Sequence, residues 1–296
     1  MKPRVAIIGS FIQDEAAQQP RPDETAPAEQ GLAVALGCRR LGAEVDLLLA
    51  LGGDEAGKLL MQRLPRDFDL HARYVRRYPG VASEQAHERL DAAHVALAGK
   101  ALERAALVYA RFETPPPTAL EAFSRAGEGA CTVLNPSPWQ PLQADLLACT
   151  QVLLVNAGQA AQLLPGWPPD LQPGQRVALA AMLRPWWHRW PGGPERTLVV
   201  TLGAHGALAF TPDGESYGMP ALPVPAPCER GAGDAFAAGL CTALARRRPI
   251  RQALGLGNAC GAFAAAHEGQ LPAWAELRAF VKTAVAAARQ TLKNTA

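Results

Sequence analysis

The sequence lacks the patterns that mark zinc sites, disulfide-bonded domains and membrane spans. Its six cysteines form no CxxC pair and its six histidines form neither HxH nor HExxH, so no metal ligated by the protein is expected. Most cysteines fall in apolar segments, which favours buried thiols in a reducing compartment. The apolar stretch Val5–Ile8 is too short for a signal peptide, and no run approaches membrane-spanning length. We therefore expect a cytoplasmic protein that does not contact a membrane.

A strong excess of charge is also absent. The chain has 29 basic and 27 acidic side chains, a net charge of +2, and its basic residues are scattered. A nucleic-acid partner is therefore not expected. In contrast, apolar residues are plentiful, because 49% of the 296 residues are hydrophobic. That content suffices to bury a large core.

Short apolar runs alternate with helix-like segments along most of the chain. The first three elements read as strand, helix and strand at Val5–Gly9, Leu32–Leu41 and Val45–Leu51. Nearly continuous apolar strands separated by helices indicate an α/β fold with a mainly parallel sheet covered on both faces. Beyond Gly231 the pattern predicts helices only. Further strands are expected at 106–110, 131–135, 151–156 and 197–203, and further helices at 118–126, 157–164, 234–247, 250–267 and 274–290.

One stretch is unusually rich in tryptophan, proline and glycine. It is RPWWHRWPGGPE, from Arg184 to Glu195, and it reads as a surface excursion. Its tryptophans either pack against a neighbouring helix or form a contact patch, and packing is the more common use of such side chains.

The stretch CERGAGDAFAAGL, Cys228 to Leu240, places two glycines and an aspartate where an apolar helix begins. Glycines let the backbone approach a ligand closely, and the free N–H groups of a first helical turn attract an anion such as phosphate. Asp234 could there accept a proton from a substrate hydroxyl while those N–H groups hold a transferring phosphoryl group. The alternative is a tight turn in which Asp234 only caps the helix.

Several longer pieces of the sequence resemble the ribokinase-like carbohydrate kinases of the PfkB family. The string GAGDAFAAGL is similar to the second signature of that family, and VTLGAHGAL, Val200 to Leu208, is similar to its nucleotide loop. Other similar pieces follow in the family's order over almost the whole chain. They are IIGSFIQD (7–14), PRPDET (20–25), LGGDEAG (51–57), VLNPSP (133–138) and LGNACGAFAAAHEGQLP (256–272).

The resemblance implies a single ribokinase-like domain over residues 1–296, with a small or reduced β lid formed by segments of about 12–28 and 71–98. Within the second segment, HARYVRRY and HVALA are the only plausible strands. The resemblance also implies ATP-dependent phosphorylation of a hydroxyl on a sugar or sugar-like molecule. Mg²⁺ would be carried mainly by ATP, and a homodimer could form through the lid.

The resemblance further assigns roles to individual residues. Asp234 is implied as the catalytic base, and Gly231, Ala232 and Gly233 as the anion hole. The residues implied for the nucleotide are Asn156, Thr201, Gly203, Gly206 and Asn258, and those implied for the acceptor are Asp14, Gly31 and Ala33. For Asn156 and Thr201 the alternative is turn chemistry after a strand, and for Asp14 it is the capping of a turn.

The chain departs from the family pattern at the acceptor. The first signature, GGxGxN, reads AEQGLA here, so Ala33 stands at its asparagine position, and Ile12 replaces the asparagine of the opening strand motif. Each lost hydrogen bond to a substrate hydroxyl costs about 1–3 kcal/mol. A less hydroxylated or partly apolar acceptor therefore fits better than a ribose-type polyol.

The chain also departs at the ion sites. Gln159 replaces the glutamate expected three residues after Asn156, and a neutral amide orders metal-bound water less strongly. The family's DTxGAGD reads CERGAGD, which puts the monovalent-cation loop in doubt. Our hypothesis is that Arg230 supplies some of that positive charge at the phosphates, and the alternative is a solvated loop arginine.

Two functions other than a kinase are alternatives for this sequence. A non-catalytic ligand- or nucleotide-binding regulatory protein on the same scaffold would explain Gln159, Ala33 and Cys228, but it would not need the carboxylate of Asp234. A dinucleotide oxidoreductase does not fit, because GSFIQD and not GxGxxG follows the first strand.

Overall fold

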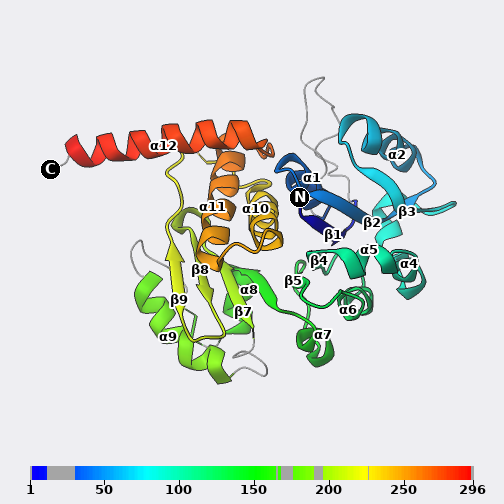
Figure 1. Ribbon diagram of the computed structural model, residues 1–296, viewed down its shortest axis with the longest axis horizontal. Coiled ribbons are helices and arrows are strands. Elements are labelled where there is room, and N and C mark those ends of the chain that lie inside the picture. Colours follow the sequence, from blue (N-terminus) through cyan, green and yellow to red (C-terminus); the bar gives the residue numbers. More distant parts are fainter. Residues whose placement is uncertain are drawn as a thin grey trace.

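A nine-stranded sheet runs through the centre of the molecule, in the order β3-β2-β1-β4-β5-β6-β7-β8-β9 (Figure 1). The computed structural model describes residues 2–11, 31–164, 166–167, 176–189, 196–225 and 227–294. Neighbouring strands from β3 to β7 pair in parallel, and β8 and β9 close the sheet as an antiparallel hairpin. The strands are β1 Arg4–Ile8, β2 Glu44–Gly52, β3 His71–Tyr78, β4 Leu107–Arg111, β5 Cys131–Asn135, β6 Val152–Asn156, β7 Thr197–Thr201, β8 Ala207–Phe210 and β9 Ser216–Met219.

The inner strands are apolar at nearly every position because helices cover both faces of the sheet. Along β1, Val5 and Ile7 pack into one hydrophobic cluster while Ala6 and Ile8 pack into the other. This alternation follows from the twofold repeat of a strand. The predicted mainly parallel sheet with helices on both faces is thus confirmed.

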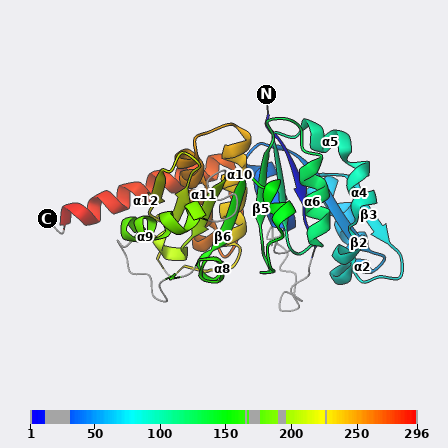
Figure 2. The same ribbon diagram turned by 90° about the horizontal axis from the view of Figure 1, so that it is seen from below.

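The two helical layers are distinct in Figures 1 and 2. One layer holds α1 Gly31–Arg40, α2 Glu55–Asp67, α10 Ala232–Ala245, α11 Ile250–Ala266 and α12 Trp274–Asn294. The other holds α3 Ser83–Ala86, η2 His87–Arg89, α4 Ala92–Leu97, α5 Gly99–Arg104, α6 Pro116–Ser124, α7 Ala144–Ala148, α8 Ala157–Leu163 and α9 Arg176–Arg189. None of the helices within these ranges is long and apolar enough to cross a bilayer.

Helix α10 packs between α1 and α11 and against β1 and β4. Nearly all of its residues from Ala235 to Ala245 are buried, and most of them are small, so the three helices approach closely. Because the helix is enclosed on several sides, its position over the sheet is set by packing. Its N-terminus is thereby held near the carboxyl ends of β1 and β4.

The expected lid segment 71–98 does not form a separate β layer. Residues 71–78 are the predicted strand, but β3 pairs in parallel with β2 and extends the main sheet. The prediction of a strand at HVALA is wrong, because these residues lie mainly in α4, where the Asp91 carboxylate accepts a hydrogen bond from the backbone N–H of His94 at 2.9 Å. The other lid segment, 12–28, lies outside the described residues. The homodimer through the lid stays a prediction.

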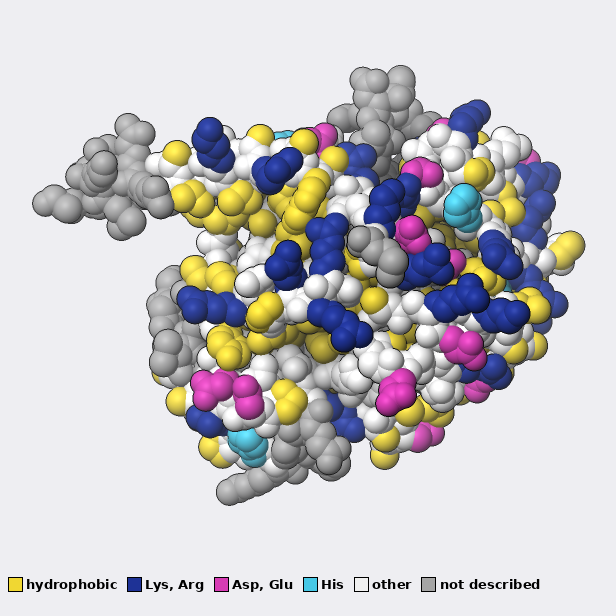
Figure 3. Space-filling view, viewed as in Figure 1, with side chains coloured by type: hydrophobic (Ala, Val, Ile, Leu, Met, Phe, Trp, Pro, Cys, Tyr) yellow, Lys and Arg dark blue, Asp and Glu magenta, His cyan; other side chains and the backbone are white. Residues whose placement is uncertain are grey.

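The face drawn in Figure 3 carries Lys and Arg side chains with Asp and Glu among them. Hydrophobic side chains gather along the side of α12 that faces the body. In Figures 1 and 2 the end of α12 projects away from the sheet. The picture agrees with the scattered charge seen in the sequence, because basic and acidic side chains share this face.

The first half of the tryptophan-rich stretch 184–195 is helical, so the predicted surface excursion is wrong for these residues. Residues up to Arg189 belong to α9, and Trp187 is only 1% exposed in the cluster that covers β7 and β8. The packing alternative is therefore confirmed for Trp187. The remaining residues, 190–195, lie outside the described part of the chain.

We expect W187A to lower the free energy of unfolding by about 3–5 kcal/mol, because it leaves a large cavity in the core. W187F should cost less, because the smaller ring refills most of that space. The matched control is L97A, since Leu97 is 69% exposed and such surface changes stay within about 0.5 kcal/mol. Urea unfolding measures all three. A cost for W187A no larger than that of L97A would contradict the buried position of Trp187.

Candidate active site

The parallel strands bring most of the predicted site residues to one edge of the sheet. Asn156 and Thr201 are register partners at the carboxyl ends of β6 and β7. Arg111 and Asn135 are register partners at the ends of β4 and β5. Ligands of open α/β sheets bind at this edge. The strand order therefore joins residues that lie far apart in the sequence.

Among the described residues, the N-terminus of α10 is exposed at Gly233. Gly231 stands at the N-cap with φ +68°, and no side-chain hydrogen bond caps the helix in the described structure. The N–H of Ala232 donates to Glu229 O at 3.3 Å. A Cβ placed on Gly233 would meet no atom within 4 Å. The space beside this turn and the positive end of the helix dipole suit an anion.

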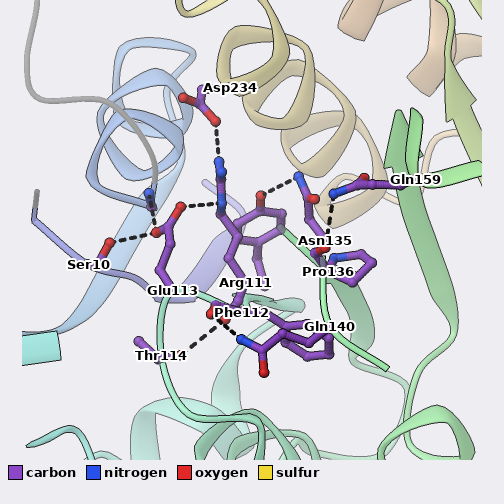
Figure 4. A network of polar contacts seen from close by, with 12 residues as sticks. Ser10, Arg111, Phe112, Glu113, Thr114, Asn135, Pro136, Gln140, Gln159 and Asp234 are labelled. Atoms are coloured by element: carbon purple, nitrogen blue, oxygen red, sulfur yellow. Dashed lines mark hydrogen bonds and ion pairs between the residues drawn. The ribbon is translucent and has the colours of Figure 1, made fainter. Parts of the chain in front are cut away.

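A buried ionic network links Asp234 to the opposite side of the site (Figure 4). Arg111 ends β4, and its side chain points to the face that carries α10, as Tyr109 does two residues earlier. Its Nη1 donates to Asp234 Oδ1, and its Nε lies 2.6 Å from Glu113 Oε1. Ser10 Oγ donates to Glu113 Oε2 at 2.6 Å. The network therefore joins the ends of β1 and β4 to the start of α10.

The charges in this network are nearly removed from water. The side chains of Arg111, Glu113 and Asp234 are 9%, 1% and 14% exposed. Burial raises the pKa of Glu113, and the Arg111 charge and the Ser10 hydrogen bond offset part of that rise. Burial alone would lower the pKa of Arg111, but Tyr109 and the two carboxylates raise it above its usual range. Arg111 therefore stays protonated between two acids.

Gly31 lies where the chain leaves no room for a side chain. A Cβ on Gly31 would stand 2.4 Å from Gly9 Cα, so the start of α1 rests directly on the end of β1. The Gly31 N–H also donates to Glu113 Oε2 at 3.3 Å. Ala33 lies on the same helix and is buried in the hydrophobic core, and Asp14 lies outside the described residues. The predicted contacts of Gly31, Ala33 and Asp14 with an acceptor stay predictions.

The residues predicted for the nucleotide converge on β7 to β9. Gly206 has φ +94°, and a Cβ there would stand 2.0 Å from Met219 O. Asn258 Nδ2 donates to Met219 O at 3.1 Å and to Pro220 O at 3.2 Å. The end of β9 thus lies directly against Gly206, and Asn258 fixes it by two hydrogen bonds. Gly203, at φ +55°, opens to free space.

Asn156 and Gln159 form a capping box at the start of α8. Asn156 Oδ1 accepts from Gln159 N at 2.8 Å, and Gln159 Oε1 accepts from Asn156 N at 2.9 Å. Gln159 Nε2 also donates to Pro136 O at 2.9 Å, a bond that an ionised carboxylate cannot make. The turn chemistry considered for Asn156 is therefore present.

These amides do not fit a magnesium ion held by the protein. Both are neutral, and the side-chain oxygen of each already accepts a hydrogen bond from the backbone N–H of the other residue, whereas Mg²⁺ is usually held by carboxylates and phosphates. Within the described ranges, no group of three His, Cys, Asp or Glu side chains could hold a metal ion. That magnesium is carried mainly by ATP stays a prediction.

A pocket of about 470 Å³ opens beside Arg111 and Glu113. Its wall is formed by the residues that follow β4 and β5 and by η2, which belongs to the segment 71–98. The lining residues are His87, Glu88, Arg111, Phe112, Glu113, Thr114, Pro115, Pro116, Ser137, Pro138 and Gln140.

Sequence reasoning missed Ser10, Arg111 and Glu113. The signal was present, because Ser10 and Arg111 directly follow apolar runs that were predicted as strands and Glu113 lies two residues after Arg111. The rule that ligands bind where parallel strands end would have selected them. Their partners could not be selected, because pairing across strands depends on the strand order.

We expect the ionisation of Glu113 to destabilise the folded protein as pH rises. Its pKa is raised by burial above the ordinary 4.5, so its stabilising contribution is present below that value and is lost as pH rises through the folded-state pKa. The free energy of unfolding of the wild type minus that of E113Q should therefore fall from about pH 4 to pH 7. Urea unfolding over this pH series measures it. A difference that stays constant or rises would contradict the prediction.

Comparison with known proteins identifies the family of this chain. The model of the pfkB family carbohydrate kinases matches residues 23–276. A ribokinase of Schizosaccharomyces pombe is 25% identical over 82% of this chain and 80% of its own. A bifunctional ribokinase/ribose-5-phosphate isomerase A of Fructilactobacillus sanfranciscensis is 29% identical over 46% of this chain, and the match spans 24% of that protein.

Solved structures agree with the fold. The Arabidopsis thaliana ribokinase complexed with ribose and ATP superposes with a TM-score of 0.72 at 18% identity, covering 96% of this chain and 99% of the other. The Cryptococcus neoformans ribokinase in complex with ADP has a TM-score of 0.72 at 21% identity, covering 95% and 100%. With the family model matching most of its length, the chain belongs to the pfkB family carbohydrate kinases.

Proposed function

We propose that this kinase transfers the terminal phosphoryl group of ATP to a hydroxyl of a sugar-like molecule, with Asp234 as the base. One observation carries the proposal: Asp234 lies in the first turn of a helix without a side-chain cap and is ion-paired to the wall of a pocket. Arg111, which lines the pocket, therefore links the base at the anion site to a cavity for an acceptor. This is the arrangement that in-line phosphoryl transfer needs.

The nucleotide is proposed to lie along the ends of β6 to β9 with its phosphates at the start of α10. ATP supplies the phosphoryl group, and its magnesium neutralises phosphate charge. The chain contributes the N–H groups near Gly233 and the open turn at Gly203, where a side chain would not obstruct a ligand. The Arabidopsis thaliana ribokinase, which has the same fold, was solved in complex with ribose and ATP, and this supports ATP as the nucleotide.

The acceptor is proposed to enter the pocket beside Arg111 and Glu113. Four apolar residues line it, namely Phe112, Pro115, Pro116 and Pro138. Its charged neighbours are acidic apart from Arg111, which is already shared by two carboxylates. A neutral and partly apolar alcohol therefore suits this pocket better than a sugar acid or sugar phosphate.

A second candidate function is a nucleotide- or ligand-binding regulatory protein without turnover. The observation in its favour is the attachment of Gln159 to Pro136, which commits this side chain to the fold. Against it stands the ion pair of Asp234, because holding a carboxylate at an anion site has a cost that mere binding would not require.

We expect D234N to reduce acceptor-dependent ADP release by about 10²–10⁴-fold, because the amide cannot accept the hydroxyl proton. ATP with magnesium should still raise the unfolding temperature of D234N, since the anion site consists of backbone groups. A panel of neutral sugars, nucleosides and small alcohols identifies the acceptor first.

The matched control is D145N, because Asp145 also lies in the first turn of a helix and is exposed. It should retain full turnover. Binding of a ligand by the wild type without turnover of any acceptor would favour the regulatory function. Full activity of D234N would overturn the assignment of the base.

We also expect turnover to be independent of potassium and R230A to lower kcat by about 10- to 100-fold, less than the loss of a backbone anion-hole donor. Arg230 is exposed and directly precedes the turn at Gly231, where its charge can reach a phosphate. The control is R248A, since Arg248 lies just beyond the opposite end of α10 and is exposed. Potassium-stimulated turnover with R230A equal to the wild type would exclude this role.

A further inference from the structure

Arg111 is a buried cation to which the proposed function assigns no role. It occupies the centre of the network in Figure 4, between the carboxylates of Asp234 and Glu113. A buried guanidinium is costly unless it is paired, and a buried carboxylate even more so. Each member of this network therefore stabilises the charge of the others.

The elements that carry the network are rigid. Arg111 ends a central strand of the sheet, and Tyr109, two residues earlier on the same face, is fully buried. Asp234 lies on a helix that packs between two other helices. The contact between Arg111 Nη1 and Asp234 Oδ1 thus joins two parts that packing already holds in place.

Glu113 fixes the other side of the guanidinium. Its Oε1 lies 2.6 Å from Arg111 Nε, and its Oε2 accepts from Ser10 Oγ and from the N–H of Gly31. Arg111 is therefore held by a hydrogen bond to the carboxylate at the anion site and by an ion pair with the carboxylate on the pocket wall. Without the arginine, these two like charges would be left unscreened in a site of low polarity.

We propose that Arg111 is the positioning residue of the base. It holds Oδ1 of Asp234, so that the second carboxylate oxygen accepts the proton, and it ties this orientation through Glu113 to the wall of the acceptor pocket. The inference rests on the proposed role of Asp234. In Figure 4 the second oxygen of Asp234 points away from the guanidinium.

The proposed transfer moves one proton to Asp234 and one phosphoryl group to the acceptor. The acceptor O–H gives its proton to the second oxygen of the Asp234 carboxylate as the acceptor oxygen bonds to phosphorus. The bond from that phosphorus to the bridging oxygen of ADP breaks, and ADP leaves with the electron pair. Arg111 keeps all of its protons and holds the carboxyl group in place throughout.

The kinetic test uses R111A and R111K in the full-length protein. We expect R111A to lower kcat about 10²-fold with little change in KM for ATP, because a misplaced base slows chemistry and leaves nucleotide binding intact. R111K, which keeps the charge, should recover part of kcat. Added guanidinium at concentrations that do not unfold the protein should recover part of the activity of R111A.

The matched control is R125A, since Arg125 forms an exposed ion pair with Glu121. It should keep the kcat of the wild type and show no response to guanidinium. A kcat for R111A within about twofold of the wild type, or a loss confined to KM for ATP, would overturn the proposal. So would a kcat of R111K no better than that of R111A together with no recovery by guanidinium.

A second measurement does not need activity. Unfolding midpoints of R111A, D234N and the double variant form a double-mutant cycle. We expect R111A to lower the midpoint, and D234N to lower it less, or to raise it, when Arg111 is already absent. Additive shifts would overturn the pairing. A coupled cycle in a protein that phosphorylates no acceptor would instead contradict the proposed function while leaving the ion pair established.

Discussion

Two buried carboxylates on either side of one arginine set the architecture of the candidate site. Glu113 and Asp234 belong to different elements, and Arg111 compensates both charges in a site with little access to water. Because Glu113 also binds Ser10 and the start of α1, the same arginine connects the acceptor pocket to the anion site. The pocket wall and the proposed base are in this sense one ionic unit.

The sheet makes that unit possible. Parallel strands end at one edge, so β1, β4, β5, β6 and β7 all deliver polar residues to the same side. Helix α10 is buried over most of its length, which fixes its start near β1 and β4. An exposed helical turn without a side-chain cap can then face an anion without cost to the core.

The departures from the family pattern have a consistent physical meaning. Gln159 is hydrogen-bonded to Asn156 and to Pro136. Its side chain therefore stabilises the start of α8, whereas a carboxylate at this position could have bound an ion. The segment 71–98 extends the main sheet and then turns helical, and His87 and Glu88 from it line the pocket. The GAGD sequence at the start of α10 follows the family pattern while the positions predicted for the acceptor depart from it, which agrees with the proposed kinase with an altered acceptor.

Local patterns in the sequence predicted the strands β1 to β7, six of the helices from α1 to α12 and the glycine turn before Asp234, because periodicity and backbone freedom are properties of neighbouring residues. The short hairpin strands β8 and β9 were not predicted. They also indicated the family, since its motifs are short and ordered along the chain. The pairing of Arg111 with Asp234, 123 residues apart, was decided only by the tertiary structure. It depends on β4 lying between β1 and β5 and on α10 packing over that edge. Strand order also decided that 71–78 joins the main sheet, because an edge strand and a lid strand look alike in sequence.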